Sequence, residues 1–405
     1  MSRRAAVALV VAAVLVVGVV AIVASSSSGS SSGSGGPPGS AAATVPVVPL
    51  PSSVTVAART SVVLPMGHLD DPANTFWQLF LRPTGGGAWR LETPPGVADN
   101  GGLVVSLPSA GPLTAGFLTS ADLHFSPLAQ TVDGGSTWTP GQLPTALVAV
   151  PDALATGAGG GLLALVAQAG QSVLASDGDP TAWRTEVSTA ALARAVPACG
   201  VTRITAVAFD AADRPVVGVG CARAGVLGVL TAASPAAGLP SGPGTWQPLE
   251  PVTTSASATT TVLRLDTTSS GLQGLAELRS GSAASLEALW AQGVNGRWAV
   301  SPTLSLAGGW TVRATAVGGG AGAGAAVLLA SGTARRIEEV GAPGAAWATL
   351  PDVPAGTGAI AAVGAETDAF VASGSHLTVW AWTPATGGWR HQASITVPIQ
   401  YGSSS

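Results

Sequence analysis

The segment Thr131-Val132-Asp133-Gly134-Gly135-Ser136-Thr137-Trp138 decides how this chain is expected to fold. It places an aspartate, two glycines, a serine and a threonine directly before a tryptophan. Glycine adopts positive φ at no steric cost, and an aspartate side chain accepts hydrogen bonds from turn amides. The segment therefore predicts a tight turn between two β-strands, with the second strand beginning at the tryptophan.

Comparable turns precede seven tryptophans, which are separated by 49, 45, 63, 52, 49 and 42 residues. Intervals of about 40 to 50 residues are typical of four-stranded propeller blades. The sequence therefore predicts an all-β, seven-bladed β-propeller, with six or eight blades as alternatives. The tryptophans are Trp89, Trp138, Trp183, Trp246, Trp298, Trp347 and Trp389, and the expected blades are 47–97, 98–147, 148–190, 191–253, 254–305, 306–354 and 355–399. For ring closure, we expect 394–399 to pair with a strand near 54–63.

The composition agrees with strands and turns, because 47% of the residues are apolar, 9% are charged, and the chain has 54 Gly and 30 Pro. We expect one propeller domain over 52–399 and a disordered tail over 400–405. Beyond Arg3 and Arg4, 15 arginines stand against 21 acidic residues, with no basic cluster in the sequence. Nucleic acid is therefore not an expected partner, since phosphates require convergent cations.

Residues 5–24 form an uninterrupted run without charge. A helix of this length spans about 30 Å, the thickness of a bilayer core. Because Arg3 and Arg4 precede the run, we expect 1–4 to be cytoplasmic, 5–24 to be a transmembrane signal-anchor and the propeller to be extracytoplasmic. A cleaved signal peptide, giving a secreted protein, is the alternative. The Ser/Gly/Pro-rich stretch 25–51 is predicted to be a disordered linker.

Cys199 and Cys221 are the two cysteines of the chain. An extracytoplasmic compartment permits a disulfide between them. The residues between them predict a hairpin with strands near 204–209 and 215–220 around a turn at 210–214. A simple hairpin register does not place the two cysteines opposite each other, so pairing requires the loop that carries Cys199 to fold back.

The segment 131–138 resembles the Asp-box of the sialidase-like (BNR) repeat family. Asp133, Gly135, Thr137 and Trp138 match its pattern, and Thr131 replaces the commoner serine. The resemblance implies a β-propeller in which the aspartate accepts turn amides and the tryptophan packs between neighbouring blades. It also implies that this motif stabilises the fold and takes no part in catalysis.

The catalytic set of the sialidases is incomplete in this chain. These enzymes use a tyrosine nucleophile and an Arg-Ile-Pro element, whereas the single tyrosine here is Tyr401 among terminal serines and the element is absent. The sequence shows no phosphate-binding loop and no metal-ligand spacing, so no cofactor and no metal are expected. One polar cluster, His68, Asp70, Asp71 and Asp99, forms either ordinary turns or a polar site at the propeller funnel.

We therefore expect a membrane-anchored binding or assembly module of the cell envelope, with its ligand at the funnel face. The expected partner is a cell-envelope protein or a glycan, and the sequence does not indicate an oligomeric state. One alternative is a degenerate sialidase-like glycoside hydrolase or another envelope hydrolase or lyase. A structural spacer without a ligand is a further alternative.

Overall fold

The computed structural model describes residues 47–49, 60–61, 66–68, 78–83, 87–94, 103–106, 113–117, 128–140, 151–167, 170–176, 183–232, 246–249, 257–268, 271–292, 297–318, 324–363, 366–373 and 376–396. The chain divides into two units, Met1–Ala43 and Thr44–Ser405, and every described residue belongs to the second. The segments 1–4, 5–24 and 400–405 lie outside the described residues. Within the described ranges, no helix is long and apolar enough to cross a membrane.

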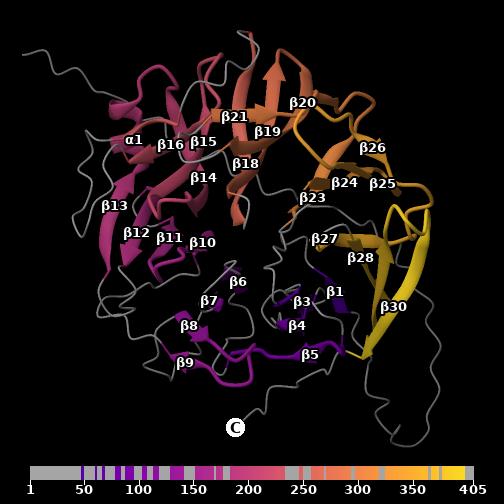
Figure 1. Ribbon diagram of the computed structural model, residues 1–405. Coiled ribbons are helices and arrows are strands. Elements are labelled where there is room, and N and C mark those ends of the chain that lie inside the picture. Colours follow the sequence, from indigo (N-terminus) through magenta and orange to yellow (C-terminus); the bar gives the residue numbers. More distant parts are fainter. Residues whose placement is uncertain are drawn as a thin grey trace, which may run out of the picture. The chain divides into compact units, whose positions relative to one another are not determined.

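The fold is all-β and propeller-like, with antiparallel sheets whose strands are mostly paired in sequence order (Figure 1). The first strands are β1 (Val47–Pro49), β2 (Thr60–Ser61), β3 (Met66–His68), β4 (Phe80–Pro83) and β5 (Arg90–Leu91); β1 pairs with β3, and β4 lies between β2 and β5. A four-stranded sheet follows, made of β6 (Leu103–Ser106), β7 (Leu113–Phe117), β8 (Leu128–Thr131) and β9 (Thr139–Pro140). The next contains β10 (Ala153–Thr156), β11 (Leu162–Val166), β12 (Ser172–Ser176) and β13 (Arg184–Ser188).

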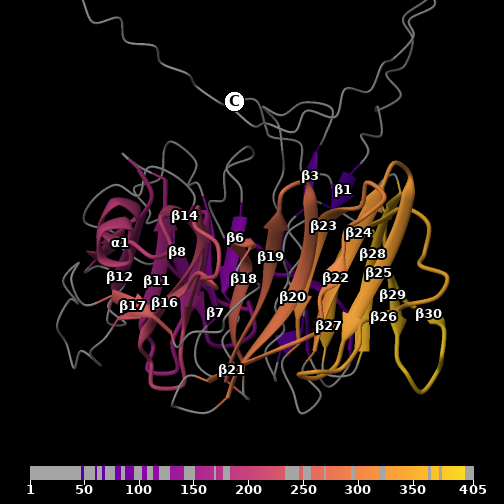
Figure 2. The ribbon, with the colours of Figure 1, turned by 90° about the horizontal axis from the view of Figure 1, so that it is seen from above.

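A nine-stranded sheet occupies the middle of the chain and consists of two successive meanders. The first contains β14 (Val201–Phe209), β15 (Pro215–Cys221), β16 (Val229–Ala232) and β17 (Trp246–Pro248). The second contains β18 (Thr259–Thr268), β19 (Gly271–Ser280), β20 (Ala283–Gln292), β21 (Arg297–Val300) and β22 (Leu304–Ser305). A single residue pair, Gly220 with Thr261, joins the two meanders. Figure 2 shows β18, β19 and β20 side by side.

Two further four-stranded sheets complete the described structure. They are β23 (Thr311–Val317), β24 (Ala325–Ser331), β25 (Ala334–Val340) and β26 (Ala348–Thr349), and then β27 (Thr357–Val363), β28 (Glu366–Ser373), β29 (His376–Trp382) and β30 (Trp389–Thr396). One helix, α1 (Thr189–Ala195), follows β13, and the Ser188 hydroxyl caps it by accepting a hydrogen bond from the Ala191 amide.

The strands of each sheet fall within one of the units predicted from the tryptophan spacing, except that the nine-stranded sheet spans two of them, one for each meander. The start of ordered structure differs from the prediction, because β1 lies inside the stretch 25–51 that we expected to be a linker. Its proline, Pro49, has no N–H to donate, which suits a strand at a sheet edge. Ordered pairing therefore begins before residue 52.

Apolar residues pack between successive sheets and form the core. One cluster joins the β10–β13 sheet to the β14–β17 meander, the next joins that meander to β18–β21, and two more continue to the β23–β26 and β27–β30 sheets. A smaller cluster joins β8 to β11. Because each sheet is covered on both faces, its strands are almost continuously apolar; all five residues of β11 are buried.

The seven repeated tryptophans lie at or immediately before the start of the last strand of their unit or, for Trp298, of the last strand but one, and each belongs to or packs against an apolar cluster. Three of them also donate a hydrogen bond to a backbone carbonyl group of the preceding unit. The indole N–H groups of Trp298, Trp347 and Trp389 donate to the carbonyl oxygens of Leu249, Pro302 and Pro351 at 3.1, 2.8 and 2.8 Å. Each acceptor follows the previous repeated tryptophan by three or four residues. The tryptophan of one unit therefore binds the backbone that follows the tryptophan of the unit before it.

The last sheet packs on the first ones through another apolar cluster, which combines Leu79, Phe80 and Leu81 with Phe370 and Leu377. A charged group lies at the same junction. Glu366 of β28 accepts hydrogen bonds from Arg82 of β4 at 3.3 Å and from Arg390 of β30 at 2.8 Å. Residues 397–399 and most of 54–63 lie outside the described residues, so the expected strand pairing stays a prediction; the contacts described at this junction are made by side chains.

A second carboxyl group, Asp368, is fully buried beside Glu366. Burial, together with the charge of Glu366, raises the pKa of Asp368 well above its usual value. Burial alone would also raise the pKa of Glu366, but hydrogen bonds from Arg390, Asp368 and Arg82 outweigh it and lower that pKa. The two pKa values therefore shift in opposite directions, so that the charged form is favoured at Glu366 and the neutral form at Asp368.

Cys199 and Cys221 form a disulfide, as the sequence predicted. The predicted hairpin is also present, as β14 and β15. Two register shifts in β14 move its first residues along β15, so that Val201 pairs with Cys221 and the Arg223 amide donates to the Cys199 carbonyl. These shifts bring the cysteines together.

An irregularity recurs in the first strands of four consecutive units. The register shifts between Ile204 and Ala206 in β14, Val262 and Arg264 in β18, Val312 and Ala314 in β23, and Thr357 and Ala359 in β27. Each shift leaves one residue without a partner in the ladder, as in a β-bulge, and a bulge redirects the side chain of the extra residue. The four extra residues are Thr205, Leu263, Arg313 and Gly358.

We expect Trp347→Phe to lower the free energy of unfolding by about 1 kcal/mol more than a matched change does, because it removes the hydrogen bond to Pro302. The matched change is Trp380→Phe, since the structure records no hydrogen bond from the Trp380 indole within the described residues. Chemical denaturation of both variants measures the difference. Equal losses would show that the indole hydrogen bond contributes nothing beyond packing.

Candidate functional site

A groove of about 860 Å³ lies between the β18–β22 meander and the β23–β26 sheet. Its walls come from β18, β19, β20 and β23, from the turn between β19 and β20, and from the connection that leads from β22 into β23. Most of the lining residues are small, namely Ala, Gly, Ser and Thr. The groove therefore opens where the chain passes from one unit to the next, on a rigid β framework.

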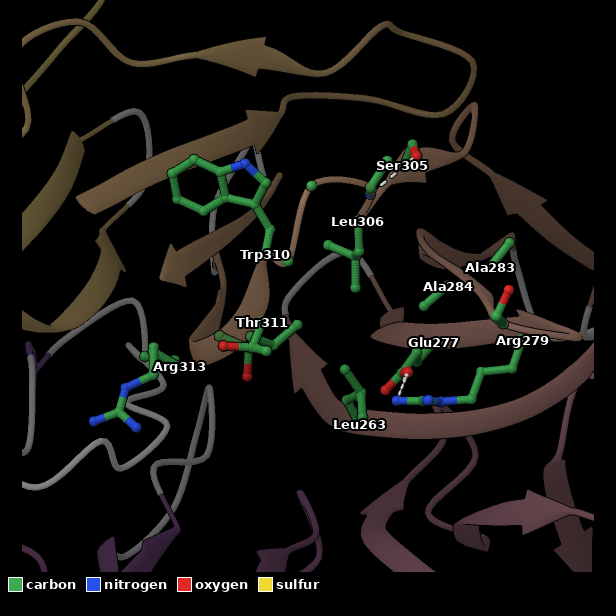
Figure 3. A pocket seen from close by; sticks show the side chains of 17 residues that line it. Leu263, Glu277, Arg279, Ala283, Ala284, Ser305, Leu306, Trp310, Thr311 and Arg313 are labelled. Carbon is green, nitrogen blue, oxygen red and sulfur yellow. Dashed lines mark hydrogen bonds and ion pairs between the residues drawn. The ribbon is translucent and has the colours of Figure 1, made fainter. Parts of the chain in front are cut away.

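Charged and aromatic side chains line the groove beside these small residues (Figure 3). Figure 3 shows Arg279 and Glu277 on one side and Thr311, Trp310 and Arg313 on the other. The Arg279 guanidinium contacts the Glu277 carboxylate at 2.5 Å, and the Arg279 side chain is 65% exposed. Glu277 is the single carboxylate in the described lining, and it is already neutralised by its partner.

The Arg336 side chain packs on the Trp310 ring and holds it in place. The guanidinium carbon of Arg336 lies 4.6 Å from the centre of the Trp310 ring, a cation–π contact, and Arg336 also pairs with Glu338 at 2.8 Å. Arg313 is the bulged residue of β23 and is exposed. Within the described residues no ion pair holds its guanidinium.

Deeper in the groove, the carbonyl oxygen of Thr315 accepts a hydrogen bond from Arg264 Nη1 at 3.3 Å. Arg264 is buried and pairs with Asp266. This arginine of one unit therefore fixes the first strand of the next unit and makes that wall of the groove rigid.

The groups in the described lining of the groove are suited to binding a ligand. Hydrolysis of a glycosidic bond ordinarily uses two carboxyl groups on either side of the bond, and the described lining supplies one, which is paired. The residues can instead donate hydrogen bonds from arginine and hydroxyl groups and offer an aromatic ring for packing.

The predicted Asp-box forms the turn that its sequence indicates. The Asp133 carboxylate accepts hydrogen bonds from the Thr137 amide at 2.9 Å, from the Thr137 hydroxyl at 2.5 Å and from the Thr131 hydroxyl at 2.8 Å. The Thr131 hydroxyl accepts in turn from the Gly135 amide at 2.9 Å. The hydrogen bonds from Thr137, followed by the one from Thr131, lower the pKa of Asp133 to about 2.

Gly135 joins this turn to the neighbouring sheet. Its φ is +98°, and a Cβ at this position would lie 2.5 Å from the Glu92 Cβ. Only glycine fits both the backbone conformation and the close approach. Trp138 packs against the apolar cluster at the junction of the first and last sheets. The box thus fixes a turn and its contact with the next sheet, a structural role.

The other predicted site residues are not brought together by any described contact. His68 ends β3, but its side chain lies outside the described residues, as do Asp70, Asp71 and Asp99. Their convergence at the funnel stays a prediction. Among the described His, Cys, Asp and Glu residues, no group of three or more is arranged to hold a metal ion.

The sequence analysis missed the groove residues. Trp310 follows two glycines, Gly308 and Gly309, so its local pattern resembles that of the repeated tryptophans. It lies at the start of a first strand, whereas the seven repeated tryptophans lie at the last strands or, for Trp298, at the last strand but one. The signal that could have indicated this site is that Trp310 does not fit the spacing of the seven repeated tryptophans.

Comparison with known proteins supports the fold. No family model matches the chain, and no curated protein does. Among solved structures, a GH74 xyloglucanase from Xanthomonas campestris is 15% identical with a TM-score of 0.51, over 83% of this chain and 52% of the other. The structure described as YCF48 bound to D1 peptide is 13% identical with a TM-score of 0.41, over 88% and 97%. A fungal lectin, Aleuria aurantia lectin with a six-bladed β-propeller fold, is 14% identical with a TM-score of 0.41, over 89% and 98%. The chain spans about half the length of the xyloglucanase chain. The similar structures are β-propellers, and at these identities they support the fold alone.

We expect Asp133→Asn to lower stability at pH 7, because an amide cannot replace the carboxylate that accepts these hydrogen bonds. The folded-state pKa, about 2, lies below the usual value of 3.8. The stabilisation is therefore complete above about pH 4 and is lost as the pH falls through about 2. Denaturant titrations of both proteins between pH 7 and pH 2 should show the gap in unfolding free energy narrowing at acidic pH.

The matched control is Ser136→Ala in the same turn, since the Ser136 hydroxyl donates to the Asp133 carbonyl and not to its carboxylate. Its effect should not change over this pH range. A gap for Asp133→Asn that is constant down to pH 2 would contradict the role of the charge.

Proposed function

We propose that this chain is a membrane-anchored, extracytoplasmic β-propeller that acts as a binding module in the cell envelope. It has seven blades of the sialidase-like Asp-box type, and its ligand is a glycan or a cell-envelope protein. The site is the groove between the β18–β22 meander and the β23–β26 sheet.

The observation that carries this proposal is the composition of the groove. It combines an open groove of about 860 Å³, hydroxyl and arginine donors and an indole, while its one described carboxylate is paired with Arg279. A pocket of this size is within the range of about 300 to 1,000 Å³ in which proteins hold small ligands. These features suit recognition better than hydrolysis.

Support for seven blades comes from the order of the described strands. Successive antiparallel units occur at β2–β5, β6–β9, β10–β13, β14–β17, β18–β22, β23–β26 and β27–β30. Each contains one repeated tryptophan. The hydrogen bonds of the Asp133 turn support the Asp-box assignment.

Support for an extracytoplasmic location comes from the disulfide between Cys199 and Cys221. Disulfides persist in oxidising compartments and are rare in the cytosol. The uncharged run 5–24 after Arg3 and Arg4 supports the anchor and its orientation.

The groove is tested by filling it. Ala307 is exposed at its rim, so Ala307→Trp should narrow the opening without disturbing the core. On a glycan array and in pull-downs with defined envelope proteins, the wild type should retain a ligand that the variant loses. The exposed residue Ala385, in the turn between β29 and β30 and outside the described lining, provides the control Ala385→Trp. Equal binding by wild type and Ala307→Trp would refute the groove as the ligand site.

The location is tested separately. We expect alkaline phosphatase fused after Ser405 to be active, because that enzyme requires an oxidising compartment outside the cytoplasm. A fusion that lacks 1–24 should be inactive. Activity of the truncated fusion, or inactivity of the full-length one, would contradict the proposed orientation.

A further inference from the structure

We infer that the ligand of the groove is a polyanionic saccharide, held by arginines that gather at one end of three consecutive units. This inference rests on the proposed function, because it names the ligand class of the same groove.

The topology places these arginines together. In an antiparallel meander, the start of the first strand, the end of the second and the start of the third lie at the same end of the sheet. Arg203 is near the start of β14, Arg313 is near the start of β23, and Arg279 is at the end of β19. Arg223 follows the end of β15, and Arg335 and Arg336 begin β25. We call this set of six residues the arginine end.

The three units that carry the arginine end are packed on one another. Apolar clusters join β14–β17 to β18–β21 and β18–β20 to β23–β25. The groove opens at the same end, since its lining includes Ser282 in the turn after β19 and Arg313. Arg279 and Arg313 therefore line the groove, Arg336 contacts its Trp310, and the other three arginines lie at the same end of these units.

These arginines are available to an external anion. Arg203, Arg223, Arg279 and Arg313 are exposed, and Arg335 and Arg336 are partly buried. In the described part of the chain, only Arg279 and Arg336 of this set form ion pairs, with Glu277 and Glu338. Arg335 donates to the carbonyl oxygens of Gly332 and Ala334, which leaves its charge uncompensated.

Among the described residues, the opposite end of the same units does not have this cationic excess, because Arg214 and Arg264 there are paired with aspartates. The turn between β14 and β15 contains Asp210, Asp213 and Arg214, and Asp266 lies near the end of β18. Arg214 is paired with Asp210 at 2.6 Å. The chain as a whole has a formal net charge of −4. A cationic end on an acidic protein concentrates anions at one place and repels them elsewhere.

The acidic residues at the arginine end are few. Glu277 is paired with Arg279, and Asp352 is exposed in the connection after β26. With Glu338, which pairs with Arg336, three carboxylates stand against six guanidinium groups and leave a net positive charge at this end. Guanidinium groups bind carboxylate and sulfate oxygens through paired N–H donors, so an anionic ligand gains both charge and geometry.

The groove favours a saccharide over an added peptide strand. A peptide would have to pair with the free edge of β23, but the bulge at Arg313 interrupts that edge and Arg264 already occupies the Thr315 carbonyl. Small residues and hydroxyl groups line the walls, with Trp310 available for packing against the C–H groups of a sugar. A flat membrane surface would contact the arginines without entering the groove.

The test is a binding titration of the full-length protein in detergent with oligogalacturonate and with a neutral maltooligosaccharide of equal length. We expect oligogalacturonate to bind at least about 10-fold more tightly, since hydrogen bonds to charged groups are worth about 1.5–3 kcal/mol. Replacing Arg203, Arg223 and Arg313 together by Gln should reduce its affinity by about 10-fold or more and weaken its dependence on salt. Arg90→Gln, an exposed arginine of β5 outside these units, is the control and should leave binding unchanged.

Each other outcome overturns the inference in a distinguishable way. If the maltooligosaccharide binds as well, and Ala307→Trp removes its binding, the proposed function survives and the anionic class is wrong. If phosphatidylglycerol vesicles or a poly-glutamate peptide bind through the same arginines and oligogalacturonate does not, the saccharide class is wrong. If Arg90→Gln weakens binding as much as the triple variant, the arginine end has no special role. Thermal unfolding of every variant shows that each is folded.

Discussion

Packing between successive sheets is the interaction on which the rest of this structure depends. Inner strands such as β11 and β24 are buried along almost their whole length, which agrees with a charged fraction of only 9% in the chain. Apolar packing is not directional, so by itself it would allow one sheet to shift along its neighbour. The indole hydrogen bonds of Trp347 and Trp389 to the carbonyls of the preceding unit supply the missing direction. The repeated tryptophan thus sets both the contact and its register.

The features that could be predicted from the sequence depend on residues close together in the chain. The Asp133 turn is determined within eight residues, because its donors and acceptors are all local. The tryptophans repeat with the unit length, so their period is visible without a structure. The cysteine pair was predicted from the compartment, although the two register shifts in β14 that make it possible could not be foreseen.

The candidate site could not be predicted in the same way, because its residues come from different units. Arg279 and Arg313 are 34 residues apart and lie in different sheets, and neither belongs to a motif. The arginine end could not be predicted for the same reason. Its residues are far apart in the chain, and the strand ends that carry them come together only after folding. The side-chain contacts between the first and last sheets also escaped prediction, since Arg82 and Glu366 are separated by 284 residues.

That separation has a consequence for how the protein is made. Leu79, Phe80 and Leu81 leave the ribosome early, but the residues that cover them, Phe370 and Leu377, are synthesised near the end. Closing so long a loop is entropically costly, and synthesis proceeds at about 5–20 residues per second. The apolar residues of β4 are therefore synthesised long before the residues that bury them. Because the last sheet covers the first ones, the apolar residues 79–81 need protection until β28 and β29 have been synthesised.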